Sequence, residues 1–258
     1  MSLTAAQLVT LATQEAKCPG FTSQAGQFLN QTLEELCEDY DVEQARGFTS
    51  VTFNSGTVTL VAGGTVPSVG SGPYALPADY LRARVQDGKD MVIWSLNGVP
   101  YPLIQITYAE YLWLVQTPGF TAYPQNYATD RSLKVYTTPV IYVWPPASLQ
   151  STPLAIYYQR LMPDITTPET SSTVPWFPNS TVLQRSVAGR LMGITGDSRM
   201  EAYLGDDPEK SPMSWKTLLN NWLKNADDRE GAAKTVGLDR RRFNRPFDAL
   251  RNTKQVGW

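Results

Sequence analysis

The stretch FTSVTFNSGTVTLVAGG (residues 48–64) is the point where the chain changes its periodicity. Apolar and polar residues alternate on both sides of Asn54-Ser55-Gly56, which predicts a β-hairpin. Before this stretch the apolar residues follow a helical repeat, and beyond it strand-like runs continue to about residue 162. We therefore expect a β-rich module over residues 48–162.

Several features of this module can be assigned from its sequence. Asn97-Gly98 predicts a turn, YAEYLWLVQ (108–116) has helical spacing, and VPSVGSGPYALP (66–77) is typical of a loop. Prolines at positions 139, 145, 146 and 153 lead us to expect short or edge strands next to them. The strand-like runs are DYLRARVQD, MVIWSL, YPLIQITY, QNYATD with SLKVYTT, VIYVWP and LAIYYQRL.

Two helices are predicted ahead of the module. Thr4 and Gln7 have the spacing of a capping box at the start of the first helix. Its apolar face comprises Ala5, Leu8, Val9, Ala12 and Ala16. CPGF (18–21) ends this helix, and Thr22 or Ser23 is expected to cap the second. The apolar face of the second helix comprises Ala25, Phe28, Leu29, Leu33, Leu36 and Tyr40.

Helices return after a Ser, Thr and Pro linker, PDITTPETSSTVPWFP (163–178). Asn179 or Ser180 is expected to cap a helix, and a short helix over residues 198–204 follows. Asp206 or Asp207 is expected to cap a last helix that runs to about residue 233. The apolar face of the first of these helices comprises Leu183, Val187, Leu191 and Ile194, and that of the last comprises Trp215, Leu218, Leu219, Trp222 and Ala226.

Neither end of the chain holds enough helix for a bundle of its own. We therefore predict an α+β fold in which residues 1–47 and 163–236 form one helical bundle. The β-rich module, residues 48–162, is inserted between the two halves of this bundle. Residues 237–258 are predicted to form an extended C-terminal arm.

This last segment, GLDRRRFNRPFDALRNTKQVGW, differs in charge from the rest of the chain. Its six basic and two acidic residues give +4 in a chain of net charge −2, which leaves −6 for the remainder. Arginine and aromatic side chains are common anchors of protein interfaces, and Pro246 favours an extended backbone. The predicted docking arm comprises Arg240, Arg241, Arg242, Phe243, Arg245, Phe247 and Trp258. Two other interpretations stay open: a solvated terminus without a partner, and a segment that binds the phosphates of nucleic acid.

Several functional classes find no support in the composition. The chain has no histidine, which is the commonest general base and metal ligand, and only two cysteines. We expect Cys18 and Cys37 to be reduced, and we predict no catalytic residue, no metal and no cofactor. The glycines at 63–64 and 70–72 lack the Lys-Ser/Thr of a phosphate loop. No run reaches the ~20 apolar residues of a membrane span, and the start of the chain lacks a signal-peptide pattern, so we expect synthesis in the cytoplasm and no membrane contact.

Aromatic residues crowd the predicted β-rich module. They include Trp94, Tyr101, Tyr108, Tyr111, Trp113, Tyr123, Tyr127, Tyr136, Tyr142, Trp144, Tyr157 and Tyr158. Core and interface packing is the favoured interpretation, because only three basic residues accompany them between positions 100 and 160. A carbohydrate- or nucleic-acid-binding module that uses Trp113 and Trp144 is the alternative. A hydrolase that uses Glu110 or Asp130 is a third hypothesis, which no pair of acids supports.

The order of these motifs resembles that of the head-to-tail adaptor, or connector, proteins of short-tailed bacteriophages. The resemblance spans roughly residues 3–226. It rests on LPADYLR (76–82), YPLIQITYAEYL (101–112), YPQNYATDRSLKVY (123–136), VWPPASLQSTPLAIYYQRL (143–161), VPWFP (174–178) and GDSRMEAYLGDD (196–207).

This resemblance implies a structural virion protein and not an enzyme. Such adaptors are similar in forming a ring, usually of twelve copies, which binds below the portal protein and extends the DNA channel. The inserted β module then meets tail tube, nozzle or fibre proteins, and the C-terminal extension, here about 235–258, grips the portal. Double-stranded DNA passes through the ring without specific binding. The expected location is the head–tail junction of the virion, after synthesis in the host cytoplasm.

Overall fold

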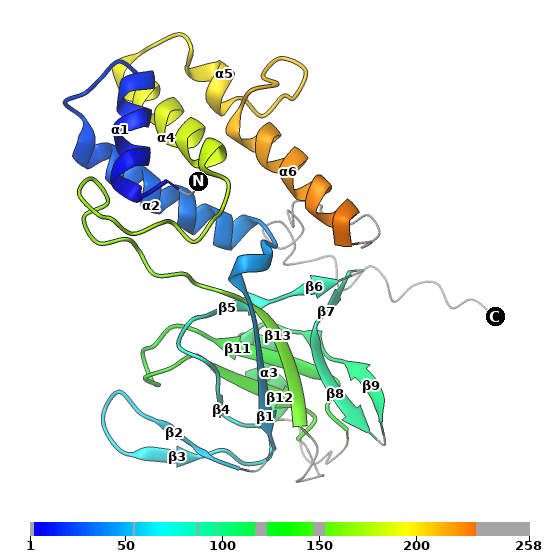
Figure 1. The fold of residues 1–258 in the computed structure, drawn as a ribbon. Helices are drawn as coiled ribbons and strands as arrows, with labels where there is room; N and C mark the ends of the chain where they lie inside the picture. The colour runs from blue at the N-terminus through cyan, green and yellow to red at the C-terminus, as the bar shows by residue number, and fades with distance from the viewer. Residues whose placement is uncertain are drawn as a thin grey trace. The chain divides into compact units, whose positions relative to one another are not determined.

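The fold was derived from a computed structural model, which describes residues 3–53, 55–86, 88–96, 98–116, 123–146 and 153–230. The chain divides into two compact units, and each is described by itself (Figure 1). The helical unit comprises Met1–Gln44 and Pro163–Trp258, and the β-rich unit comprises Ala45–Met162. The described residues contain six α-helices and thirteen strands, so the predicted mixed α+β class is confirmed.

The helical unit begins with two helices, α1 (Ala5–Glu15) and α2 (Thr22–Asp39). The predicted capping box is confirmed, because the Thr4 side chain accepts a hydrogen bond from the Gln7 backbone and the Gln7 side chain accepts one from the Thr4 backbone. The predicted cap of α2 is wrong. Thr22 already lies inside the helix, and Phe21 occupies the capping position without a side-chain hydrogen bond. A short 3-10 helix, η1 (Glu43–Ala45), follows α2.

The centre of the helical unit is α4 (Ser180–Thr195), which packs against α1, α2, α5 and α6. Asn179 caps it, since its side chain accepts a hydrogen bond from the Val182 N–H. Gly196 ends it in the left-handed conformation that favours glycine. Of the predicted apolar face, Ile194 is wrong: it is 52% exposed, because α5 packs on the side of α4 that carries Gly189 and Gly193.

Two further helices complete this unit, α5 (Met200–Leu204) and α6 (Trp215–Glu230). The predicted cap of α6 is also wrong, because Asp206 and Asp207 lie well before the helix begins. Ser214 stands at that position instead, and its Oγ accepts a hydrogen bond from the Thr217 N–H at 3.3 Å. The predicted end of this helix near residue 233 lies outside the described residues.

The larger sheet of the β-rich unit is antiparallel and centred on its last strand. Its strand order is β1-β13-β8-β9, and β5 pairs with the same side of β13 as β8 does. Its strands are β1 (Arg46–Thr52), β5 (Tyr80–Ala83), β8 (Val92–Leu96), β9 (Val99–Pro102) and β13 (Pro153–Arg160). β1 pairs with β13 along its whole length, from Arg46 opposite Gln159 to Thr52 opposite Pro153.

This pairing corrects the predicted hairpin. β1 does not pair with β2 (Thr57–Thr59), which instead forms a separate ribbon with β3 (Thr65–Pro67). Gly63 and Gly64, both with positive φ, make the turn of that ribbon. The alternation therefore predicted two strands correctly but assigned them the wrong partner. By contrast, the turn predicted at Asn97-Gly98 is confirmed, since β8 and β9 pair up to Leu96 and Val99.

The second sheet has the order β10-β11-β12-β4, in which only the β10–β11 pair is parallel. Its strands are β4 (Tyr74–Ala75), β10 (Ile104–Gln105), β11 (Asn126–Asp130) and β12 (Val140–Trp144), and α3 (Tyr108–Val115) packs against β11 and β12. SLKVYTT does not form a strand; only Tyr136 makes a bridge, to Leu60. A small ribbon of β6 (Val85–Gln86) and β7 (Lys89–Asp90) completes the described strands.

The expectation of short or edge strands next to the prolines is wrong for β13. β12 is short, with five residues, but it does not lie at an edge. β13 is the eight-residue centre of its sheet, and β12 lies between β11 and β4. Pro153 is the first residue of β13, and Pro139 and Pro145 flank β12. These positions avoid the loss of a central ladder hydrogen bond, so proline does not force either strand to an edge.

Each of the two units has its own apolar core. The helical core is built from α1, α2, α4 and α6 with Ile165 and Phe177, and the β-rich unit has two clusters. One cluster lies between the larger sheet and neighbouring segments, and the other lies under α3. Cys18 and Cys37 are both buried, and neither forms a disulfide.

Candidate interaction surfaces

The predicted docking arm lies outside the described residues. Its seven side chains, Arg240, Arg241, Arg242, Phe243, Arg245, Phe247 and Trp258, therefore stay a prediction. The described residues contain other candidate surfaces, on helix α3, on the larger sheet and on the helical unit.

The aromatic residues of the β-rich unit separate into a buried and an exposed set. Trp94, Tyr111, Tyr127, Tyr142 and Tyr158 are buried, which confirms that part of the group packs in the core. Those exposed are Tyr101, Tyr108, Trp113 and Tyr123. Trp94 lies close to two of the exposed rings, with centroids 5.7 Å from Tyr101 and 5.1 Å from Tyr123. Two of the four exposed rings therefore pack against a core residue.

Helix α3 carries the most exposed aromatic side chain of this set. Trp113 is 68% exposed, and Leu112 and Val115 beside it are 46% and 44% exposed. The helix is held by a capping box, in which the Thr107 N–H donates to the Glu110 carboxylate at 2.7 Å and the Glu110 N–H donates to the Thr107 hydroxyl at 3.1 Å. Apolar side chains on the outer side of a fixed helix are suited to contact another macromolecule.

The same hydrogen bonds bear on the hydrolase hypothesis. The Glu110 carboxylate is used to cap α3, and the Asp130 carboxylate accepts a hydrogen bond from the Ser132 N–H at 2.8 Å. Each acid thus has a local structural role. The capping signal was present in the sequence as Thr107 and Glu110, three positions apart, ahead of an apolar run.

Beneath α3 lies a cluster of tyrosines. The Tyr142 hydroxyl donates to the Tyr136 hydroxyl at 3.2 Å, and the ring of Tyr111 lies 4.8 Å from that of Tyr142. Burial raises the pKa of Tyr111 from 10.0 to about 12. The pKa of Tyr142 is raised strongly, mainly by burial and in addition by the hydrogen bond to Tyr136. These hydroxyls stay protonated at neutral pH, so the cluster is a structural support for α3.

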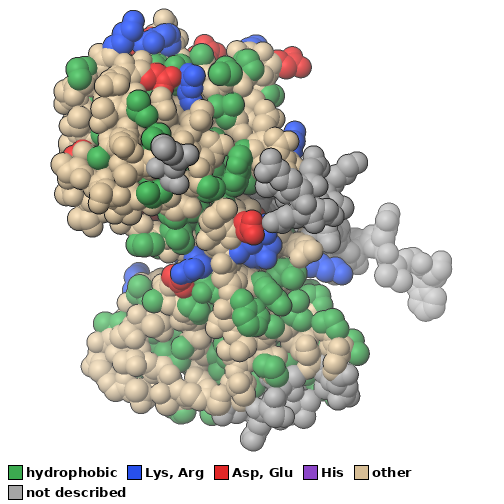
Figure 2. All heavy atoms as spheres, viewed as in Figure 1, with side chains coloured by type: hydrophobic (Ala, Val, Ile, Leu, Met, Phe, Trp, Pro, Cys, Tyr) green, Lys and Arg blue, Asp and Glu red, His purple; other side chains and the backbone are tan. Residues whose placement is uncertain are grey.

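The larger sheet has an open face with apolar character. Phe48 of β1 is 59% exposed, and its ring lies 5.0 Å from that of Tyr157 on β13, directly opposite. Figure 2 shows hydrophobic side chains gathered on the β-rich unit over β1, β13, β8 and β9. A solvated sheet face is normally polar, so this face is a second candidate contact surface.

The charged side chains of the helical unit mainly join its helices. Glu15 of α1 receives a salt bridge from Arg185 at 2.9 Å and a hydrogen bond from the Tyr203 hydroxyl at 2.7 Å. Arg190 of α4 pairs with Glu35 of α2 at 2.6 Å. Asp206 and Asp207 pair with Lys216 and Lys210, as expected for surface acids.

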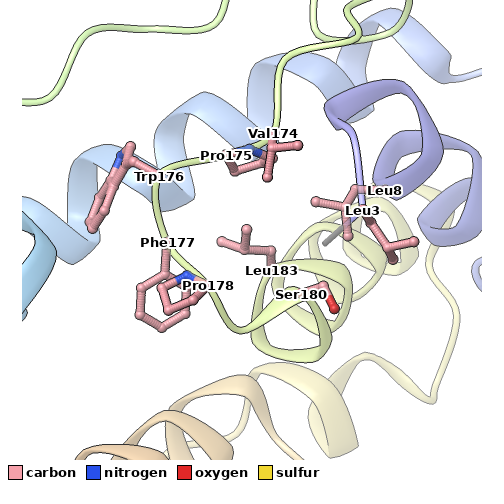
Figure 3. A pocket seen from close by; sticks show the side chains of 9 residues that line it. All are labelled: Leu3, Leu8, Val174, Pro175, Trp176, Phe177, Pro178, Ser180 and Leu183. Atoms are coloured by element: carbon pink, nitrogen blue, oxygen red, sulfur yellow. The ribbon is translucent and has the colours of Figure 1, made fainter. Parts of the chain in front are cut away.

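A pocket of about 220 Å³ lies on the helical unit between the start of α4, residue Leu3 and the segment 174–178. Figure 3 shows Leu183 rising from α4 into the space between this segment and Leu3 and Leu8. The pocket is lined by Leu3, Leu8, Val174, Pro175, Trp176, Phe177, Pro178, Ser180 and Leu183, none of which is charged. None of the sequence patterns predicts this pocket.

Other kinds of site find no counterpart in the part of the chain that the structure describes. There, no three His, Cys, Asp or Glu side chains gather as metal ligands would. Within the same ranges, every helix is too short or too polar to cross a lipid bilayer.

Comparison with known proteins identifies the family of this chain. The family model described as SU10 adaptor protein matches residues 3–242, which includes both units and the first arginines of the predicted arm. A search of curated proteins found no match. The chain belongs to the SU10 adaptor protein family, a family of phage head-to-tail adaptors.

Proposed function

We propose that this phage adaptor protein forms a ring that binds below the portal protein, extends the DNA channel and attaches tail components. The observation that carries the proposal is the family match over residues 3–242. The ring of about twelve copies comes from the resemblance to head-to-tail adaptors and is part of the same proposal, as is the location at the head–tail junction.

The division of the chain supports separate roles for its parts. The helical unit, 1–47 with 163–236 in our proposal, builds the ring, and the inserted module, 48–162, offers its exposed aromatic residues to tail proteins. α3 and the open sheet face supply such residues, with Trp113 68% and Phe48 59% exposed. The net charge of −6 outside residues 237–258 suits a channel wall, because DNA is repelled from an acidic surface and slides past it.

The C-terminal segment, 237–258, is proposed to dock on the portal. Ordering about twenty residues costs about 1–2 kcal/mol each in backbone entropy. A preformed groove could offset this cost by burying Phe243, Phe247 and Trp258 and by pairing the arginines with acidic groups. Repetition around a ring then strengthens the attachment through effective concentration.

Deletion of residues 238–258 tests this assignment. We expect the truncated protein to keep its circular dichroism spectrum and thermal midpoint, but to lose its binding to the portal protein of the same phage in co-sedimentation. As a matched control, replacing Arg240, Arg241 and Arg242 with glutamine keeps the length of the arm and should weaken binding in a salt-dependent manner. Truncated protein that still joins portal-containing particles at normal stoichiometry would show that the arm does not dock.

A second candidate function is the binding of carbohydrate or single-stranded nucleic acid by the aromatic surface. The exposure of Trp113 favours it, since a flat exposed ring can stack on a sugar or base. Glycan-array and filter-binding measurements with Trp113→Ala and Trp144→Ala variants test this candidate. Binding that depends on either tryptophan would support it, and no binding by the unaltered protein would remove it.

A further inference from the structure

The larger sheet ends on one side in a long strand, β1, which lies beside β13 (Figure 1). Four described strands stand at the ends of the two sheets: β1, β9, β10 and β4. With seven residues, β1 is the longest of them. The outer backbone groups of such a strand are a template for another strand, and proteins commonly block them with proline, with charge or by keeping the strand short.

The other three ends are short or lack free donors. β4 and β10 have two residues each, and the Gln105 N–H of β10 donates to the Asp90 carboxylate at 3.3 Å. Directly after β9, the Leu103 N–H donates to a carbonyl of β8 at 2.8 Å. Because backbone groups alternate in direction along a strand, Pro100 and Pro102 face outward, where they offer no N–H.

The outer side of β1, by contrast, has free backbone groups. The Arg84 N–H donates to the Tyr157 carbonyl at 2.9 Å, and the Tyr157 N–H donates to the Met91 carbonyl at 3.0 Å, so the backbone groups of Tyr157 face away from β1. Phe48 lies opposite Tyr157, so its N–H and carbonyl face away from β13, as do those of Ser50 two residues later. Within the described residues, no hydrogen bond is made to these four groups.

The side chains along this edge are uncharged. Residues 47–52, GFTSVT, contain no Asp, Glu, Lys, Arg or Pro. Phe48 is 59% exposed on one face of the strand, and Val51 is 9% exposed on the other. Aromatic and β-branched side chains pair favourably with apolar neighbours across strands, whereas a charge beside them would lose water without an opposite charge. The edge therefore fits an uncharged segment with an apolar side chain next to Phe48.

The number of free edges bears on which chain can occupy this one. β1 has a single free edge, because β13 pairs with the other along its whole length. If the β1 strands of two copies paired, each would use up its only edge, and the contact would end at two copies. A ring of more than two copies thus leaves the β1 edges to a different protein.

We propose that β1 binds an extended, uncharged segment of a tail protein, which joins the larger sheet as a strand beside Phe48 and Ser50. In this mode of recognition, main-chain hydrogen bonds give the affinity and the neighbouring side chains give the specificity. The inference rests on the proposed function, since it assigns the contact by which the β-rich module would attach a tail component.

A matched pair of substitutions tests the contact in the full-length chain. Ser50→Pro removes an outward N–H and leaves the groups of Thr49 and Val51 that face β13, whereas Ser50→Ala changes the side chain alone. Proline is tolerated at outward positions of an end strand, as at Pro100 and Pro102. Both variants should therefore keep the thermal midpoint of the unaltered protein.

The probes are the tail proteins of the same phage, each purified and tested singly for co-sedimentation with the unaltered chain. For a tail protein that binds, we expect Ser50→Pro to weaken binding by about tenfold or more, and Ser50→Ala to bind as the unaltered chain does. Equal binding by Ser50→Pro and Ser50→Ala would overturn the proposal.

Residue-resolved hydrogen exchange gives a second measurement that needs no variant. In the isolated chain, the amides of Phe48 and Ser50 should exchange fast, and those of Thr49 and Val51, which face β13, should exchange slowly. The bound tail protein should slow the exchange of Phe48 and Ser50 by about tenfold or more. Fast exchange of both amides in the complex would overturn the proposal.

The same measurement identifies other occupants of the edge. Slow exchange of Phe48 and Ser50 in the dilute, isolated chain would mean that a segment of the same chain covers the edge. Slow exchange that appears only when the isolated chain is concentrated would mean that a second copy does. Either result would overturn the proposal.

The outcomes also separate this inference from the proposed function. If a tail protein binds the unaltered chain and Ser50→Pro equally, the strand contact is wrong and the adaptor role stands. Both variants should still bind the portal, because Ser50 lies outside the predicted arm. If no tail protein binds the unaltered chain, the attachment of tail components is wrong and the inference falls with it.

Discussion

The helical unit is organised around helix α4, whereas the β-rich unit is organised around its last strand, β13. α4 packs against α1, α2, α5 and α6, and β13 pairs with β1, β5 and β8. In both units, the central element comes after residue 150. β13 joins strands that precede it, and α4 joins two helices that precede it with two that follow. One unit is built from helices and the other mainly from strands, and the two differ in the side chains that they expose.

The helical unit hides most of its apolar side chains and pairs its charges across helices. Glu15 with Arg185 and Glu35 with Arg190 connect α1 and α2 to α4. The β-rich unit instead leaves Phe48, Tyr101, Trp113 and Tyr123 exposed. The helical unit thus uses its charged and apolar side chains mainly for contacts between its own helices. The β-rich unit leaves several aromatic side chains on its surface.

The largest change in stability is expected when side-chain volume is removed from the core of the helical unit. Leu183→Ala should lower the free energy of unfolding by about 2–5 kcal/mol, because Leu183 is fully buried and its loss leaves a cavity. Hydrogen exchange should show lost protection in α4 but not in β13. The exposed Leu11→Ala should change stability by about 0.5 kcal/mol or less. Equal loss of protection in α4 and β13 would mean that the two units unfold as one.

A substitution in the β-rich unit gives the converse experiment. A Cβ at Gly47 would lie 2.5 Å from the ring of Tyr158, so Gly47→Ala must displace that ring and its hydrogen bond to Asp79. We expect a loss of about 1–3 kcal/mol in urea unfolding, with hydrogen exchange changed in β1 and β13. Gly20→Ala is the control, since nothing lies within 4 Å of its added Cβ. A Gly47→Ala protein as stable as the control would show that Tyr158 repacks freely.

Alkaline conditions should weaken the β-rich unit through its buried tyrosines. The pKa of Tyr111 is raised to about 12 in the folded protein, above its ordinary 10.0, because burial disfavours the phenolate. The unfolded chain therefore loses this proton first, and the stabilisation present below pH 10 is lost as the pH rises toward 12. Urea midpoints measured across this range should fall, and Tyr111→Phe should reduce the slope. A slope unchanged in Tyr111→Phe would assign the pH effect to other residues.

The smallest expected effect is at the ion pair of Asp197 and Arg199, which lies between α4 and α5. Hydrogen bonds from Arg199 lower the pKa of Asp197 from 3.8 to about 2. The stabilisation is therefore present above pH 3.8 and is lost as the pH falls toward 2. Asp197→Asn should lower the thermal midpoint slightly at neutral pH and match the unaltered protein near pH 2. A double-mutant cycle with Arg199→Gln measures the pair itself, and a coupling of zero would contradict its role.

Local features of the fold could be predicted from the sequence, because they depend on neighbours along the chain. The capping box at Thr4, the cap at Asn179 and the turn between β8 and β9 each involve residues a few positions apart. The faces of α1, α2 and α4 were predicted from their helical repeat, apart from Ile194. α6 was assigned an early start because Asp206, Asp207 and Pro208 imitate a helix beginning, whereas Ser214 caps it.

Strand pairing could not be predicted in the same way. β1 alternates as a hairpin strand would, but the strand that pairs with it lies at the other end of the module. Likewise, residues 1–14 and 170–184 are visible in the sequence as two runs without charged residues, but only the hydrogen bonds from Ala5 and Ala6 show that these runs lie together. The aromatic residues of α3 can be identified from the sequence, but their exposure depends on how the helix packs. The arm residues from Arg240 to Trp258 stay a prediction.

The late position of the two central elements has a consequence for synthesis of the protein. Leu29, Leu33 and Leu36 of α2 are almost fully buried in the finished protein, yet their partner α4 ends only at Thr195. At about 5–20 residues per second, the ribosome needs about 10–30 s to proceed from the end of α2 to the end of α4. During that interval the leucines of α2 have no finished core to enter, and the larger sheet also waits for β13. The nascent chain should therefore be a client of chaperones that hold exposed apolar segments until translation is nearly complete.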